Sequence, residues 1–204
     1  MNTLDGKVAL ITGAGQGIGQ GIALALAREG AAIAVAGRTE SKLHDTCERL
    51  STIGARSAPV VCDVSRRKDI ASAVERTVDV FGGVDILVNN ANDCSPGPIL
   101  SVIDEEYERS FATGPLATLR MMQSCHPHMV SRGGGVIVNL VTSRPSAGTR
   151  ATTAPTVRSR RHAFADQVGG VRVGPGRHPG AVRRPHAKSP ALARWMDRNP
   201  DEAA

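Results

Sequence analysis

The stretch Lys7-Val-Ala-Leu-Ile-Thr-Gly-Ala-Gly-Gln-Gly-Ile-Gly-Gln-Gly21 passes from an apolar run through alternating glycines toward an alanine-rich segment. The continuous apolar run at residues 8–11 is typical of a parallel strand that is buried on both faces. Strong helix formers continue through residues 22–27, and Gly30 is placed to cap that helix. The stretch therefore predicts a strand, a tight turn and a helix.

The glycines of this turn suit the binding of a phosphate. Glycine adopts positive φ readily, and its missing side chain lets a ligand approach the backbone closely. Phosphates bind at helix N-termini because free N–H groups and the helix dipole favour negative charge there. Glycines also serve ordinary tight turns, so the turn taken alone leaves a purely structural interpretation open.

Composition predicts one domain with an aliphatic core, because the 204 residues include only five aromatic ones. The four cysteines lie at wide intervals without a C-x-x-C motif: Cys47, Cys62, Cys94 and Cys125. This spacing favours reduced thiols over a disulfide framework or a zinc site. The sequence shows neither a signal-peptide pattern nor an apolar run of membrane-spanning length. We therefore expect a soluble cytoplasmic protein without a membrane partner.

The net charge of +6 comes from the last third of the chain. Up to Ser143 there are 13 Lys and Arg against 15 Asp and Glu, whereas from Arg144 onward there are 12 against 4. A near-neutral body with few aromatic residues in its basic segment argues against a nucleic-acid partner. His126 and His128 are interpreted as polar residues near a helix end, and no metal site is predicted.

Apolar runs and helical periodicities alternate along the chain. Strands are expected at residues 8–11, 31–36, 58–62, 84–90 and 136–141. Helices are expected at residues 22–30 and 40–54, from a cap at Ser65 to about residue 81, and at residues 104–131. Gly114-Pro115 and Pro127 are expected to interrupt or end the last of these helices. This alternation predicts an α/β fold, a Rossmann-like doubly wound parallel sheet with helices on both faces. Ligands of such folds bind beyond the carboxyl ends of the strands.

Three motifs resemble those of the short-chain dehydrogenase/reductase family. They are Thr12-Gly13-x-x-x-Gly17-Ile18-Gly19, Phe81-Gly-Gly-Val-Asp-Ile-Leu-Val-Asn-Asn-Ala91 and Gly134-Gly-Val-Ile-Val-Asn139, and the resemblance extends over roughly residues 5–143. It implies an NAD(P)-dependent oxidoreductase that transfers a hydride between the nicotinamide and a small carbonyl or alcohol substrate. Family members are commonly dimers or tetramers, assembled through the helices before and after the fifth strand.

The resemblance also implies which residues bind the cofactor. The phosphates and ribose would lie at the glycine-rich turn, the adenine beside the third strand, and the nicotinamide ribose beside the fourth. The corresponding residues are Gly13, Gln16, Gly17, Ile18 and Gly19 in the turn, Asp63 and Val64 after the third strand, and Asn90 and Ala91 after the fourth. Taken singly, Asp63 is equally explained as a loop cap and Asn90 as a turn residue.

The end of the second strand predicts which cofactor is preferred. An acidic residue there would bind the ribose 2′-OH of NAD, whereas an arginine pairs with the 2′-phosphate of NADP. This chain has Arg38, and its first carboxylate after the strand is Glu40. We therefore predict NADP(H) over NAD(H), the alternative being that Arg38 is a solvated surface residue.

The catalytic residues that the resemblance implies are only partly present. Ser143 matches the family's catalytic serine, with Thr142 as the second choice. The family's acid/base tyrosine, and the lysine four residues after it, are not found. Thr156 and Arg160 stand at their positions, and the only tyrosine is Tyr107.

Two further positions depart from the family pattern. Asn92 replaces the glycine after Asn-Asn-Ala, and Phe111 or a neighbour occupies the position of the asparagine that supports the proton relay.

The departures from the family concentrate in residues 144–184, which hold nine arginines, no lysine and a single acid, Asp166. We divide the chain into a dinucleotide-binding core at 1–143, an irregular Arg/Pro/Gly-rich segment at 144–184 that replaces the active-site helix, and a C-terminal tail of the same domain at 185–204. Two compensating frameshifts in a GC-rich gene would leave this pattern. The other interpretation is a catalytically inactive, cofactor-binding pseudoenzyme. The altered segment leaves the oligomeric state open.

Overall fold

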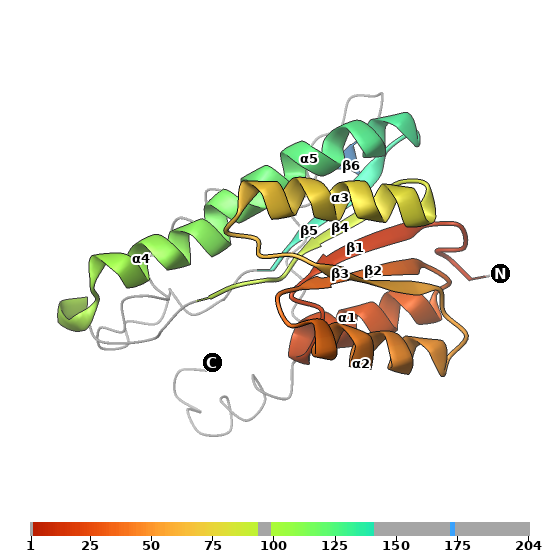
Figure 1. Ribbon diagram of the computed structural model, residues 1–204. Helices are drawn as coiled ribbons and strands as arrows, with labels where there is room; N and C mark the ends of the chain where they lie inside the picture. The colour runs from red at the N-terminus through yellow and green to blue at the C-terminus, as the bar shows by residue number, and fades with distance from the viewer. Residues whose placement is uncertain (1, 94–98, 141–171, 174–204) are drawn as a thin grey trace, which may run out of the picture.

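The computed structural model describes residues 2–93, 99–140 and 172–173. Strands and helices alternate along these residues, and helices pack on both sides of one sheet (Figure 1). The elements are β1 (Val8–Thr12), α1 (Gly17–Arg28), β2 (Ala32–Gly37), α2 (Glu40–Ser51), β3 (Ser57–Val61), α3 (Arg67–Phe81), β4 (Ile86–Asn89), the 3₁₀ turn η1 (Ile99–Ser101), α4 (Asp104–Phe111), the π-helical turn η2 (Ala112–Leu116), α5 (Ala117–Ser131), β5 (Gly135–Asn139) and β6 (Arg172–Val173).

The sheet has the strand order β3-β2-β1-β4-β5-β6, and its first five strands are parallel. Helices α1 and α2 cover one face, while α3 and α5 cover the other (Figure 1). The chain builds outward from β1 through β2 to β3 and then crosses to β4 and β5 on the opposite side. This confirms the predicted doubly wound fold, and it places a topological switch point between β1 and β4, where ligands of such folds bind.

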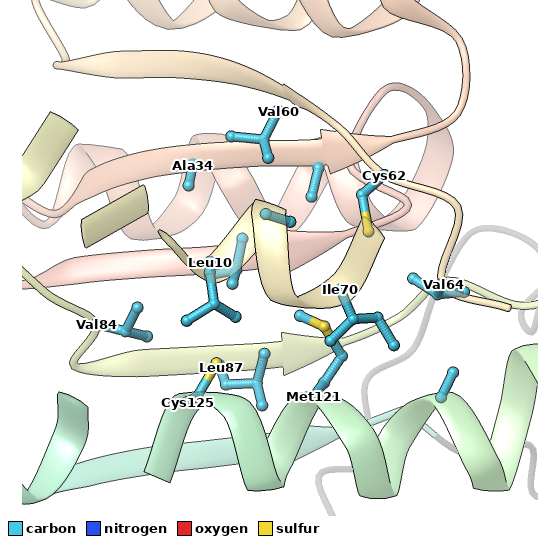
Figure 2. Close-up of a cluster of buried hydrophobic side chains, with 14 of the residues drawn as sticks. Leu10, Ala34, Val60, Cys62, Val64, Ile70, Val84, Leu87, Met121 and Cys125 are labelled. Carbon is cyan, nitrogen blue, oxygen red and sulfur yellow. The ribbon is translucent and has the colours of Figure 1, made fainter. Parts of the chain in front are cut away.

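The core is aliphatic and forms two layers, one on each face of the sheet. Successive residues of a strand face opposite sides, so Leu10 packs with α3 and α5 while Ile11 packs with α1 and α2. Figure 2 shows the first layer, in which Leu10 and Leu87 of the sheet lie with Ile70 of α3 and Met121 of α5. Both faces of the central strands are therefore buried, as their continuous apolar runs predicted.

The predicted cap of α3 is wrong, because the N-cap residue is Arg66 and not Ser65. The backbone N–H and the hydroxyl of Ser65 both donate to Asp63 Oδ1, at 3.0 and 2.8 Å. Ser65 therefore closes a local turn around the Asp63 carboxylate, and its hydroxyl is not used to cap the helix.

The predicted interruption of residues 104–131 is confirmed at Gly114-Pro115 and wrong at Pro127. The first pair lies in the π-helical turn η2 between α4 and α5. Pro127 lies inside α5, which continues to Ser131. Its ring is exposed, whereas Cys125 and Met129 on either side are fully buried. Burial of these neighbours holds the helix together across the proline, because tertiary packing outweighs a local preference.

The described part of the irregular segment contains one element that we did not predict. Arg172–Val173 forms β6, which pairs antiparallel with Gly135 and Val136 of β5. A parallel sheet that ends at β5 leaves a row of unpaired backbone groups at its edge, and any extended residues nearby can pair with it. The remaining residues of 144–184 lie outside the described part of the chain.

None of the helices in the described ranges combines the length and the apolar composition of a membrane span.

Candidate functional site

The predicted cofactor-binding residues lie together at the carboxyl edge of the sheet. The glycine-rich turn follows β1, Arg38 follows β2, Asp63 and Val64 follow β3, and Asn90 and Ala91 follow β4. Since these strands are parallel, their carboxyl ends meet at one edge. The site is therefore assembled from four segments that are separated in the sequence by whole helices.

Asn90 joins the loop after β4 to the turn after β1. Its Nδ2 donates to the carbonyl oxygens of Thr12 and Gly13, at 2.9 and 3.1 Å. The Thr12 hydroxyl accepts hydrogen bonds from the N–H groups of Asn90 and Ala91, both at 3.0 Å, and donates to the Val88 carbonyl at 3.3 Å. The Asn90 side chain is thus committed to shaping the site, a role that its position in a motif did not reveal.

Thr12 is a further residue of the site whose contribution sequence reasoning missed. The sequence identifies Thr12 only as the first residue of a motif, although its hydroxyl connects the end of β1 to the end of β4 and the loop that follows it. The available signal was a hydroxyl residue placed directly between a buried strand and a glycine turn. A side chain at that position can satisfy backbone groups which the sheet no longer pairs.

The glycines fit the close packing of this turn. Gly13 and Gly17 have φ of 65° and 59°, a region that favours glycine. A Cβ at Gly19 would overlap the carbonyl oxygen of Gly13 and approach Asn90 Nδ2 to 2.5 Å. Gly19 is therefore required by the contact between α1 and the loop after β4.

The N-terminus of α1 is open and uncapped. Gln16 is its N-cap residue but makes no side-chain capping bond, and the first turn contains no acid. The Gln16 side chain instead accepts a hydrogen bond from Lys42 Nζ at 2.7 Å. Among the described residues, no atom lies within 4 Å of a Cβ placed on Gly17, and Ile18 is 60% exposed. An uncapped helix end that faces free space is suited to a phosphate group.

Arg38 lies among carboxylates at the end of β2. Its Nη1 is 3.2 Å from Asp93 Oδ2. Burial raises the pKa of Asp63, but hydrogen bonds from Ser65 and the positive charges of Arg38 and Arg66 outweigh it and hold that pKa below its usual value. Asp63 is therefore ionised near neutral pH, so that two negative groups act on the Arg38 guanidinium.

Asp93 is a second residue of this site that sequence reasoning missed. Its N–H donates to Thr113 Oγ1 at 3.2 Å, and the Thr113 hydroxyl donates to the Arg109 carbonyl at 3.0 Å. Thr113 belongs to the π-helical turn η2, so this turn holds the loop that carries Asp93. The signal in the sequence was an acid close behind the carboxyl end of a buried strand.

The candidate catalytic residues Ser143 and Thr142, together with Thr156 and Arg160, lie outside the described residues. Tyr107 is on α4, where its ring stacks on Phe111 with the centroids 6.5 Å apart. Among the described residues, no group of three or more His, Cys, Asp or Glu is arranged to hold a metal ion.

Comparison with known proteins gives consistent matches. The family model described as short chain dehydrogenase matches residues 7–153. The ketoacyl reductase HetN of a Nostoc species is 34% identical over 142 residues, which are 70% of this chain and 50% of that protein. The sorbitol dehydrogenase of Cereibacter sphaeroides is 38% identical over 146 residues, 71% of this chain and 56% of that protein. The chain spans about half the length of these curated relatives.

Solved structures of similar fold contain both forms of the nicotinamide cofactor. The L-sorbose reductase of Gluconobacter frateurii, solved with NADPH and L-sorbose, has a TM-score of 0.77 and 31% identity, covering 82% of this chain and 65% of that one. A 7α-hydroxysteroid dehydrogenase, solved with NADH and 7-oxo glycochenodeoxycholic acid, has a TM-score of 0.75 and 26% identity, covering 79% of this chain and 63% of that one.

Proposed function

Because the chain belongs to the short-chain dehydrogenase family, we propose that it is an NAD(P)-dependent oxidoreductase acting on a small carbonyl or alcohol substrate. The observation that carries the proposal is the uncapped N-terminus of α1, where no described atom lies within 4 Å of a Cβ placed on Gly17. The position of this turn at the switch point between β1 and β4 supports it further, because dinucleotides bind there in doubly wound folds.

Each segment at the carboxyl edge has a proposed role in holding the dinucleotide. The N–H groups of the turn, from Gln16 to Gly19, hold the pyrophosphate, and the exposed Ile18 side chain packs against the ribose. Asp63 and Val64 flank the adenine. One Asp63 oxygen accepts both Ser65 hydrogen bonds, and we assign the other to the adenine amino group. Ala91 and the backbone of Asn90 border the nicotinamide ribose.

Arg38 supports the proposed preference for NADP(H). The two residues between β2 and α2 are Arg38 and Thr39, so this segment contains no carboxylate to bind a ribose 2′-OH. We expect a lower dissociation constant for NADPH than for NADH in calorimetric titrations. Replacing Arg38 with Ala is expected to weaken NADPH binding at least about tenfold, since a hydrogen bond to a charged group contributes about 1.5–3 kcal/mol, or about 10- to 150-fold in affinity. An NADH affinity equal to or above that of NADPH would contradict this preference.

In the proposed chemistry, a bound nicotinamide supplies or accepts the hydride, and this chain's residues bind and orient the substrate. Ser143, with Thr142 as the second choice, would donate a hydrogen bond to the substrate oxygen. The acid/base is unassigned, since Thr156 stands where the family has tyrosine. An aliphatic hydroxyl is a far weaker acid than a phenol, whose pKa is about 10, so Thr156 is a poor replacement.

The alternative that we propose is a cofactor-binding pseudoenzyme. The family match ends at residue 153, three residues before Thr156, so it does not include the Tyr-x-x-x-Lys positions. Calorimetry with NADPH followed by turnover assays on a panel of ketones and secondary alcohols separates the two functions. Binding with turnover supports the oxidoreductase, and tight binding without turnover supports the pseudoenzyme.

Translation of codons 144–184 in the other two frames tests the third possibility, a frameshifted product. A Tyr-x-x-x-Lys sequence on an amphipathic segment in either frame would support it. A confirmed gene sequence with no such segment would leave the oxidoreductase and the pseudoenzyme as the competing functions.

We further propose that the protein is cytoplasmic and that it forms a homo-oligomer. The free thiols of Cys47, Cys62 and Cys125 among the described residues support the cytoplasmic location.

Exposed Leu119 and Val130 on α5, a helix before the fifth strand, support the homo-oligomer. Sedimentation analysis of the purified chain measures the oligomeric state directly.

A further inference from the structure

The ion pair between Arg38 and Asp93 bridges the two sides of the proposed adenosine end of the site. Arg38 directly follows β2, and Asp93 lies in the loop after β4. These two strands are the neighbours of β1 in the sheet. The bridge therefore joins the segments on either side of the strand that leads into the glycine-rich turn.

The two partners differ in how exposed their side chains are. Asp93 is held at its backbone by Thr113 of the π-helical turn, and its side chain is 32% exposed. The Arg38 side chain is 62% exposed and bonds to Asp93 through one nitrogen, Nη1, at 3.2 Å. The guanidinium is thus the longer and more exposed member of the pair, and it can turn toward another anion.

A 2′-phosphate is a direct competitor of Asp93 for this guanidinium. Both are oxyanions that recognise the same donors, and the phosphate carries the larger charge. In this structure the guanidinium is turned toward Asp93, with Asp63 also acting on it. A ligand that bears a 2′-phosphate must take Arg38 from Asp93, whereas a ligand with a 2′-hydroxyl does not compete with Asp93 for the guanidinium.

Building on the proposed function, we propose that Asp93 is a specificity-determining residue, which competes with the 2′-phosphate of NADP(H) for Arg38 and thereby narrows the preference for NADP(H) over NAD(H). Its effect acts through Arg38 and requires no contact between Asp93 and the nucleotide. Partly exposed ion pairs contribute up to about 1 kcal/mol, which corresponds to about a fivefold change in affinity.

The test measures dissociation constants of NADPH and NADH by calorimetry for the parent chain and for Asp93→Asn. We expect Asp93→Asn to strengthen NADPH binding about three- to fivefold and to change NADH binding less than twofold. Asp79→Asn is the matched control. Asp79 is an exposed carboxylate in the last turn of α3, which leads toward the amino end of β4 and so lies at the opposite edge of the sheet. Asp79→Asn should alter neither the NADPH nor the NADH dissociation constant.

A double-mutant cycle with Arg38→Ala tests whether the effect passes through Arg38. In the Arg38→Ala background, Asp93→Asn is expected to leave the NADPH constant unchanged. An equal gain for both nucleotides, no gain for either, or a gain that persists without Arg38 would overturn the inference. A parent chain that binds neither nucleotide would overturn the proposed function and this inference with it, so the two failures are distinguishable.

Discussion

At the scale of single residues, the glycine-rich turn depends on Gly19, which has no Cβ, and on the side-chain amide of Asn90. The amide pins the carbonyls of Thr12 and Gly13, and the bare Cα of Gly19 lets α1 begin directly against them. The proposed phosphate site therefore depends on backbone geometry, which a Cβ at Gly19 would disturb.

Two glycines of α1 provide a matched comparison. A Cβ at Gly19 would overlap the Gly13 carbonyl oxygen, whereas no atom of the described residues lies within 4 Å of a Cβ at Gly21. We expect Gly19→Ala to destabilise the protein by about 1–3 kcal/mol and to abolish measurable NADPH binding. Gly21→Ala should stabilise it by about 0.5–1 kcal/mol, because alanine is the better helix former.

Urea unfolding and NADPH calorimetry on these two variants measure both effects. Similar stabilities for Gly19→Ala and Gly21→Ala would show that the turn does not require the close approach at Gly19. Normal NADPH binding by Gly19→Ala would contradict the proposed phosphate site.

At the scale of elements, the long helical region from Asp104 to Ser131 shows two ways in which a helix accommodates proline. Around Pro115 the backbone widens into the π-helical turn η2, and Thr113 in that turn holds the Asp93 loop. At Pro127 the helix continues, because Cys125 and Met129 are buried on the core side. The first proline accompanies a feature that serves the site, whereas the second has no described contact with it.

Pro127 is therefore expected to lower the stability of α5 and to be replaceable. Its ring is exposed, so its replacement sacrifices little packing, while alanine restores the backbone donor that proline lacks. We expect Pro127→Ala to raise the free energy of unfolding by about 1–2 kcal/mol, below the ~3 kcal/mol cost of proline in an isolated helix because the native backbone is already adapted to it.

The neighbouring exposed residue His126 supplies the control, since His126→Ala should change stability by less than about 0.5 kcal/mol. The measurement is urea unfolding followed by circular dichroism. A destabilised Pro127→Ala variant would show that the proline is needed to shape α5.

At the scale of the whole molecule, the buried carboxylate of Asp85 ties distant segments together at the amino edge of the sheet, opposite the proposed site. It accepts hydrogen bonds from the Val8 N–H at 2.9 Å and Lys7 Nζ at 3.5 Å, and its Oδ2 is 2.9 Å from Arg132 Nη2. Arg132 also donates to the Gly6 carbonyl at 3.0 Å. One side chain thereby links β1, β4 and the connection from α5 to β5.

Asp85 should make stability depend on pH. Burial raises its pKa, but the hydrogen bonds from Arg132 and Val8 and the charges of Arg132 and Lys7 outweigh burial, so the pKa lies below its usual value. A carboxyl group whose folded pKa is lowered stabilises the protein above its unfolded pKa of about 3.9, and this stabilisation is lost as pH falls through the folded pKa.

We expect Asp85→Asn to destabilise the protein by about 2 kcal/mol at pH 7, less than for a fully buried pair because both cations are partly exposed. The difference from the parent should shrink below about pH 4. Urea unfolding across pH 3–7 measures it, with the exposed Asp79→Asn as the control. A difference that stays constant over this range would show that the charge of Asp85 is not what stabilises the fold.

The sequence by itself determined the fold class, the strand order along the chain and the location of the proposed site. These follow from local patterns: an apolar run buried on both faces, a helical periodicity, or glycines at the spacing that a turn requires. The cofactor-binding roles, the NADP(H) preference and the catalytic assignment to Ser143 remain predictions. Ser65 and Pro127 show where local rules mislead, because a nearby carboxylate or a buried neighbour outweighed the local preference.

Only the tertiary structure decided which groups partner one another. Arg38 and Asp93 are 55 positions apart, and Asn90 and Thr12 are 78 apart, so no local pattern connects them. The pairing of β6 with the edge of β5 is of the same kind. The carboxyl ends of parallel strands meet only after each strand has been joined to the next through a crossover helix. Contacts between those ends therefore depend on the assembled sheet, and not on any one segment of the chain.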